Sequence, residues 1–105
     1  MIQLYDMAGY VCSGVSVYTS TGLKATQRFV HETILNIVEI DIKLSDILCL
    51  TLTAIYRPPN ADNLTLFYQL LEERLMSSRC QYKIIAGDIN LNIIGNMKIK
   101  IILIY

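Results

Sequence analysis

"DILCLTLTAIY", residues 46–56, decides the fold expected of this chain. The stretch is dominated by apolar and β-branched residues, which is typical of a β-strand. Alternate side chains of a strand lie on opposite faces of its sheet, and both sets are largely apolar here. One face holds Leu48, Leu50, Leu52, Ala54 and Tyr56, and the other holds Ile47, Cys49, Thr51, Thr53 and Ile55. We therefore expect a central strand that is covered on both sides.

Two strand patterns precede this stretch. "SGVSVYTS", residues 13–20, alternates in the manner of a strand and has Gly14 near its entrance. "ILNIVEIDI", residues 34–42, is apolar and β-branched. Because only the short "KLSD" joins it to the central strand, these two segments predict a hairpin.

A helix and two further strands are expected after the central strand. Pro58 and Pro59 end the strand because proline lacks the N–H that a sheet requires. From about residue 62 to residue 77 the apolar residues fall at helical spacing, preceded by possible caps at Asn60, Asp62 and Asn63. "QYKIIAGDIN", residues 81–90, returns to a strand, and we also assign the apolar run "MKIKIILIY", residues 97–105, to a strand. The apolar stripe of the helix consists of Leu64, Phe67, Leu71 and Leu75.

This order of elements predicts an α/β fold. A strand, a helix and a second strand of these lengths form a crossover unit, in which two parallel strands share a sheet and the helix packs on it. The C-terminal ends of both strands then meet at one edge of the sheet. We therefore expect a mixed sheet with a helix over about residues 62–77, and expect Tyr56, Asp88 and Asn90 to be neighbours.

The composition narrows the possible partners. Hydrophobic residues make up 53% of the 105 residues and charged residues 17%, whereas an ordinary soluble domain has about 25% charged residues. Such a chain is expected to have apolar faces that need a partner, with self-association through exposed sheet edges as one outcome. No apolar stretch reaches the roughly 18 residues of a membrane-spanning helix, so no membrane is expected. The nine basic and nine acidic residues balance, so a nucleic-acid role would depend on a local site.

The cysteines and the N-terminus indicate a compartment. Cys12, Cys49 and Cys80 are odd in number, widely spaced and without a C-x-x-C pair, which argues against a disulfide framework or a zinc site. Cys49 is most simply a small buried hydrophobic residue. The start of the chain shows no secretory signal pattern. We expect an intracellular chain in the reducing cytoplasm or nucleus, and we assign no metal ligands.

Two polar residues end an apolar strand and form the candidate site. Asp88 and Asn90 point to the same side of the strand, about 7 Å apart. A carboxylate there can orient or deprotonate a water, and an amide can donate to that carboxylate or to a phosphoryl oxygen. The hydroxyl of Tyr56 adds another donor. The alternative is that Asp88 and Asn90 only begin a turn, where Gly, Asp and Asn are the usual residues.

Three motifs occur in a recognisable order. They are "SGVSVY" at residues 13–18, "YRPPN" at 56–60 and "GDIN" at 87–90. Over about residues 9–95 the chain resembles the endonuclease/exonuclease/phosphatase superfamily, and within it the endonuclease domain of non-LTR retrotransposons. The resemblance implies a two-sheet α/β sandwich that hydrolyses phosphodiester bonds of DNA with magnesium. We assign residues 1–95 to a partial domain of this superfamily and leave residues 96–105 as an unassigned apolar tail.

The resemblance also implies roles for single residues. Tyr56 would contact the phosphate, Asp88 would position or activate the attacking water, and Asn90 would support Asp88 and the scissile phosphate. Arg57 is placed at the rim of the site as a substrate contact, where it is solvated or in a salt bridge. His31, the only histidine, matches no motif of the family and is expected in a loop or at the surface.

Departures from the family leave open whether the chain is an enzyme. The metal-binding glutamate of the family and its late Asp-His pair have no counterpart here, so a magnesium site in this chain is in doubt. We expect a truncated fragment of a magnesium-dependent phosphodiesterase that is inactive alone. The alternatives are a nucleic-acid-binding remnant without cleavage and a protein-interaction module.

Overall fold

The computed structural model describes residues 7–12, 14–33, 35–58, 64–88 and 101–104. These residues form seven strands and a helix. In chain order the elements are β1 (Met7–Cys12), β2 (Val15–Ser20), β3 (Lys24–Glu32), β4 (Asn36–Lys43), β5 (Cys49–Tyr56), α1 (Leu64–Ser77), β6 (Tyr82–Asp88) and β7 (Ile101–Ile104).

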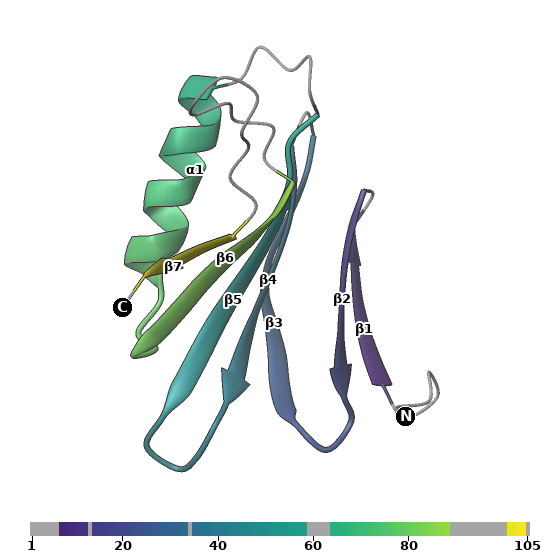
Figure 1. The fold of residues 1–105 in the computed structure, drawn as a ribbon, viewed down its shortest axis with the longest axis vertical. Helices are drawn as coiled ribbons and strands as arrows, with labels where there is room; N and C mark the ends of the chain where they lie inside the picture. The colour runs from purple at the N-terminus through teal and green to yellow at the C-terminus, as the bar shows by residue number, and fades with distance from the viewer. Residues whose placement is uncertain (1–6, 13, 34, 59–63, 89–100, 105) are drawn as a thin grey trace.

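The strands form two sheets. β1 and β2 pair as an antiparallel hairpin, and the other strands form one sheet in the order β3-β4-β5-β6-β7. In this larger sheet β5 and β6 are parallel, while the other neighbouring pairs are antiparallel. Figure 1 shows α1 on one face of the larger sheet and the β1–β2 hairpin on the other. This arrangement confirms the predicted α/β class with two sheets, one of them mixed, and a helix.

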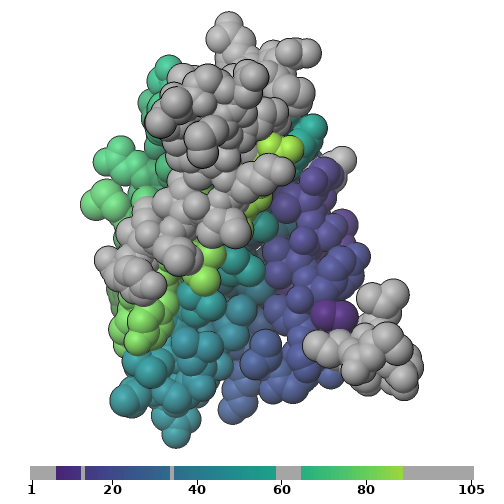
Figure 2. Space-filling view, in the orientation of Figure 1, coloured from purple at the N-terminus to yellow at the C-terminus, as the bar shows by residue number. Residues whose placement is uncertain are grey.

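The larger sheet has an apolar core on each face, as expected for a central strand covered on both sides. The core beneath α1 contains Leu35, Ile37, Ile55, Phe67, Leu70 and Ile85, with Phe29, Leu66, Leu71 and Leu75 packed against it. The core beneath the hairpin contains Cys12, Val38, Ile40 and Ile42, with Tyr10, Val15, Val17, Ala25, Leu50 and Leu52 packed against it. In Figure 2 the hairpin residues form a layer beside the strands of the larger sheet.

The predicted helix is confirmed over Leu64–Ser77, and its apolar stripe faces the sheet. Phe67 is 1% exposed, and Leu71 and Leu75 pack beside it. The side chain of Leu64 and the proposed caps lie outside the described residues. No helix within the described ranges is long and apolar enough to cross a membrane.

A buried carboxylate connects the sheet to the helix. Glu39 of β4 is 0% exposed, so its charge needs partners within the protein. Thr53 Oγ1 donates to its Oε2 at 2.7 Å, and Arg28 Nε and Arg74 Nη1 lie 3.1 Å and 3.5 Å from its Oε1. The Arg74 guanidinium also lies 3.8 Å from the ring centroid of Phe29. Side chains from β3, β4, β5 and α1 thus share one ionic cluster.

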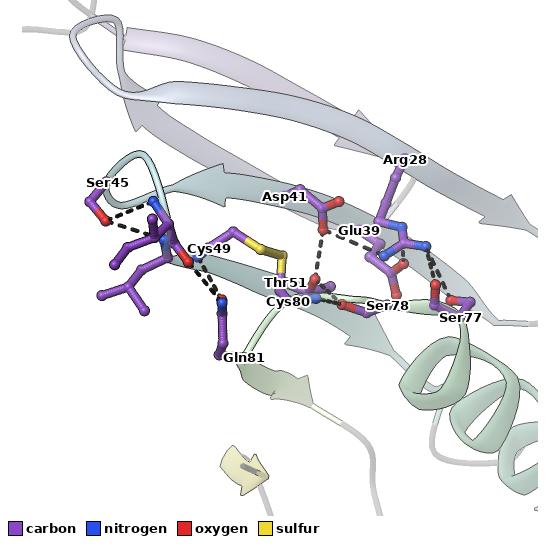
Figure 3. The surroundings of a disulfide bond; sticks show 12 residues. Arg28, Glu39, Asp41, Ser45, Cys49, Thr51, Ser77, Ser78, Cys80 and Gln81 are labelled. Atoms are coloured by element: carbon purple, nitrogen blue, oxygen red, sulfur yellow. Dashed lines mark hydrogen bonds and ion pairs between the residues drawn. A yellow bond between two sulfur atoms is a disulfide. The ribbon is translucent and has the colours of Figure 1, made fainter.

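A disulfide joins Cys49 and Cys80, whose Cα atoms are 4.9 Å apart (Figure 3). The expectation of no disulfide is therefore wrong, and so is the interpretation of Cys49 as a simple hydrophobic residue. The two cysteines are 31 residues apart in sequence, and only the crossover through α1 brings them together. A disulfide also counts against the predicted reducing compartment, since such bonds persist in oxidising ones. Cys12 is buried and forms no disulfide within the described residues.

Polar contacts surround this disulfide. The Gln81 side chain accepts from the Cys49 N–H at 3.0 Å and donates to the Ile47 carbonyl at 2.8 Å. The hydroxyl of Ser78 accepts from the Cys80 N–H at 3.1 Å and lies 2.5 Å from the hydroxyl of Thr51. These bonds, drawn in Figure 3, hold the chain on both sides of the disulfide.

The sequence reading missed two strands, β1 and β3. In β3 the pairing with β4 shifts between Gln27 and Phe29, which interrupts the alternation that a strand normally shows. His31 belongs to β3, so the loop expected for it is wrong, while its half-buried side chain meets Thr33 at an exposed position. At the other edge, β7 pairs antiparallel with β6. The predicted final strand is thus confirmed for 101–104, and the rest of that run lies outside the described residues.

Candidate functional site

The crossover brings Tyr56 and Asp88 side by side. They are register partners at the C-terminal ends of the parallel strands β5 and β6, and neighbouring strands lie about 4.8 Å apart. Just beyond them, the Arg57 N–H donates to the carbonyl of Asp88 at 2.9 Å. Tyr56 is half-buried and Asp88 is exposed. The predicted proximity of these two residues is confirmed, whereas Asn90 lies outside the described residues.

Position 87, just before Asp88, accommodates only a glycine. Its φ is +144°, a backbone conformation that residues with a Cβ rarely adopt. A Cβ at this position would also collide with the backbone of Ile55, its carbonyl oxygen above all. The glycine therefore allows β6 to approach β5 closely at the point where the chain presents Asp88.

Gly14 brings the hairpin to the same end of the sheet. Its φ is +86°, and a Cβ there would lie 2.8 Å from Tyr56 Cδ2 and 2.9 Å from Asn36 Nδ2. The turn between β1 and β2 consequently rests against the ring of Tyr56. In Figure 1 this turn lies at the end of the molecule where β5 and β6 finish. Parts of three motifs that are far apart in sequence thus meet at one end of the sheet.

Sequence reasoning missed Asn36, which also lies at this end. It begins β4 and is the register partner of Tyr56. The Cys12 thiol lies 3.8 Å from Asn36 Oδ1 and donates to the His31 carbonyl at 3.3 Å. The position of Asn36 in the sequence could have revealed it. Asn36 is the polar residue at the start of an apolar strand, and that strand is the hairpin partner of the strand that ends at Tyr56.

His31 and Arg57 lie in different surroundings. The His31 ring stacks on Phe29, with ring centroids 6.3 Å apart, and its Nε2 lies 2.8 Å from Thr33 Oγ1. Since Phe29 packs against the core beneath α1, His31 lies on the sheet face opposite to Tyr56. Arg57 is only 8% exposed, which counts against the solvated alternative, whereas the salt-bridged alternative stays a prediction.

The described residues at this edge offer hydrogen-bond donors and one carboxylate. A tyrosine hydroxyl and an amide are neutral donors, and a carboxylate can accept a proton from water. Magnesium prefers several oxygen ligands in octahedral geometry. Within the ranges that the structure describes, no group of three His, Cys, Asp or Glu side chains could hold a metal ion. We therefore assign no chemical step to a metal at this edge.

A cavity of about 400 Å³ opens at the other end of the sheet, beside the disulfide. Its charged lining consists of Lys24, Lys43, Asp41 and Asp46. Lys43 pairs with Asp46 at 3.7 Å, and Asp41 accepts from the Thr51 hydroxyl at 2.6 Å. Because these charges are balanced and largely engaged with neighbours, we place the candidate site at the Tyr56 end.

Comparisons with protein-family models, with curated proteins and with solved structures found no match to this chain.

Proposed function

We propose that this chain carries the phosphate-contacting part of a phosphodiesterase domain related to the endonuclease/exonuclease/phosphatase superfamily, with DNA as the substrate class. The observation that carries the proposal is the parallel pairing of Tyr56 with Asp88. Gly14 adds to it, because its turn lies against the Tyr56 ring. The three motifs of the resemblance to non-LTR retrotransposon endonucleases thus contribute residues to one end of the sheet.

In this proposal each side chain has a distinct task. The Tyr56 hydroxyl donates a hydrogen bond to a phosphoryl oxygen, and the exposed carboxylate of Asp88 accepts a proton from the attacking water. Asn90 adds an amide donor by analogy with the family. When bound in the parent family, magnesium supplies positive charge at the phosphoryl oxygens.

We further propose that the chain by itself does not cut DNA measurably. Without a cation, the carboxylate of Asp88 repels the phosphate that Tyr56 would hold. Loss of one donor that stabilises the transition state lowers rates by about a hundredfold to a thousandfold. The residues present match neither the metal-binding glutamate nor the late Asp-His pair of the family. Weak binding and negligible cleavage are therefore expected.

Binding and cleavage test the two parts of the proposal. Binding of a labelled DNA duplex to the chain should weaken as salt rises, because phosphate contacts release counterions. It should also weaken in Tyr56→Phe but not in Tyr68→Phe, a matched change on α1 where the tyrosine is 49% exposed. Equal DNA binding by the two variants would show that the Tyr56 hydroxyl does not contact the DNA.

Cleavage is measured on supercoiled plasmid with magnesium, beside an Asp88→Ala control. We expect no nicking by the original chain. Nicking that disappears in Asp88→Ala would instead show that the chain is active, and the proposal of an inactive site would be wrong.

A protein-interaction module is the second candidate. Several large apolar residues are exposed, among them Leu44 (51%) and Ile47 (80%) between β4 and β5 and Met76 (78%) on α1. Exposed apolar surface is a common feature of interaction sites. A soluble oligomer whose mass rises with concentration in sedimentation experiments, together with no DNA binding, would favour this candidate.

A further inference from the structure

Three polar residues form a row across three neighbouring strands. Asn36 of β4 is the register partner of Tyr56 of β5, and Tyr56 is the register partner of Asp88 of β6. Register partners lie on the same face of a sheet. Asn36 is two residues from Val38, which belongs to the core beneath the hairpin. The row therefore lies on the hairpin face, at the end of the sheet where the candidate site is placed.

The hairpin orients the amide of Asn36. The sulfur of buried Cys12 packs 3.8 Å from Asn36 Oδ1, while its single S–H donates to the His31 carbonyl at 3.3 Å. Asn36 Nδ2 lies on the side of Gly14 and the Tyr56 ring. Among the residues that the structure describes, no acceptor is hydrogen-bonded to this nitrogen. The amide nitrogen of Asn36 thus lies on the side of the site, where Gly14 and the Tyr56 ring meet.

The chemistry of such a donor suits a site that contains a carboxylate. A phosphodiester held near Tyr56 is repelled by Asp88, and each hydrogen bond to its oxygens offsets part of that repulsion. An asparagine donates such a hydrogen bond without adding charge to the site. Asn36 is half-buried, and partial removal from water strengthens a hydrogen bond.

We propose that Asn36 is a further binding residue of this site, and that its side-chain amide donates to a phosphodiester oxygen held beside Tyr56 and Asp88. This inference rests on the proposed function. It assigns a task to a residue that none of the three motifs includes.

The test uses the full chain and dimethyl phosphate, the smallest phosphodiester. The side-chain NH₂ signals of Asn36 are followed by ¹H–¹⁵N NMR as dimethyl phosphate is added. We expect these signals to shift with saturation. In Asn36→Leu, which is similar in size and has no donor, we expect the dissociation constant to rise about tenfold or more, the usual effect of losing a hydrogen bond to a charged group. Asn36→Asp should weaken binding at least as much, because it also adds a negative charge.

Two further variants separate this inference from the proposed function. Gln69→Glu adds the same charge as Asn36→Asp at an exposed position of α1 and should leave binding unchanged. Tyr56→Phe should weaken binding if the site takes phosphodiesters at all. Binding that is lost in Tyr56→Phe but kept in both Asn36 variants would overturn the role of Asn36 alone. Absence of any shift in the original chain would overturn the proposed function and this inference together.

Discussion

Removal of the Cys49–Cys80 disulfide should destabilise the chain strongly. The bond closes a loop between cysteines that are 31 residues apart. For a loop of that length, the chain-entropy relation gives a stabilisation of about 3.7 kcal/mol at 25 °C. Each kcal/mol corresponds to about 4–8 °C in Tm for a domain of this size, so reduction should lower Tm by about 15–30 °C.

The assay is urea unfolding followed by circular dichroism, with and without a reductant. The oxidised chain should unfold at a clearly higher urea concentration than the reduced chain. A Cys49→Ser, Cys80→Ser double variant should match the reduced chain and should not respond to the reductant. That variant controls for effects of the reductant that do not arise from this disulfide.

Two results would refute this reasoning. One is a change in unfolding free energy below about 0.5 kcal/mol, which is close to the error of such extrapolations. The other is the detection of three reactive thiols when the untreated chain is unfolded, since the disulfide leaves only one.

Two further substitutions test the packing that positions the candidate site. Gly87→Ala should lower the unfolding free energy by about 3 kcal/mol or abolish cooperative unfolding, because Gly87 has a positive φ and the backbone of β5 lies beside it. Gly22→Ala should change the unfolding free energy little, because the nearest atom is 3.8 Å away. Similar thermal melts for the two variants would contradict the close approach at Gly87. Glu39→Gln should lower the free energy of unfolding in urea by about 2–3 kcal/mol, because Arg28 and Arg74 lose a buried ionic partner. An unchanged unfolding midpoint would show that the ionic cluster contributes nothing to stability.

The parts of the fold that could be predicted are those with a clear period. Both faces of β5 are apolar in the sequence, and the structure covers both. The stripe of α1 repeats at helical spacing and packs on the sheet. These two elements and the strand ending at Asp88 predicted the crossover. The crossover in turn predicted that Tyr56 and Asp88 lie close together, which the pairing of β5 with β6 confirms.

The parts that could not be predicted depend on contacts between distant residues. β3 contains a register shift, so its apolar residues do not alternate regularly. Cys49 and Cys80 give no local signal of pairing, because their separation reflects the length of the crossover. Asn36 looks like any polar residue at the start of a strand. Its place beside Tyr56 depends on the exact pairing of β4 with β5.

The disulfide also has a consequence for the opposite end of β5 and β6. A slip of one residue between these strands would carry Asp88 to the other face of the sheet, away from Tyr56. The bond between Cys49 and Cys80 holds the strands where they begin. The hydrogen bond from the Arg57 N–H to the Asp88 carbonyl joins them where they end. With both ends held, the two strands cannot slide past each other, and a covalent bond at one end of the sheet preserves the alignment of Tyr56 with Asp88 at the other.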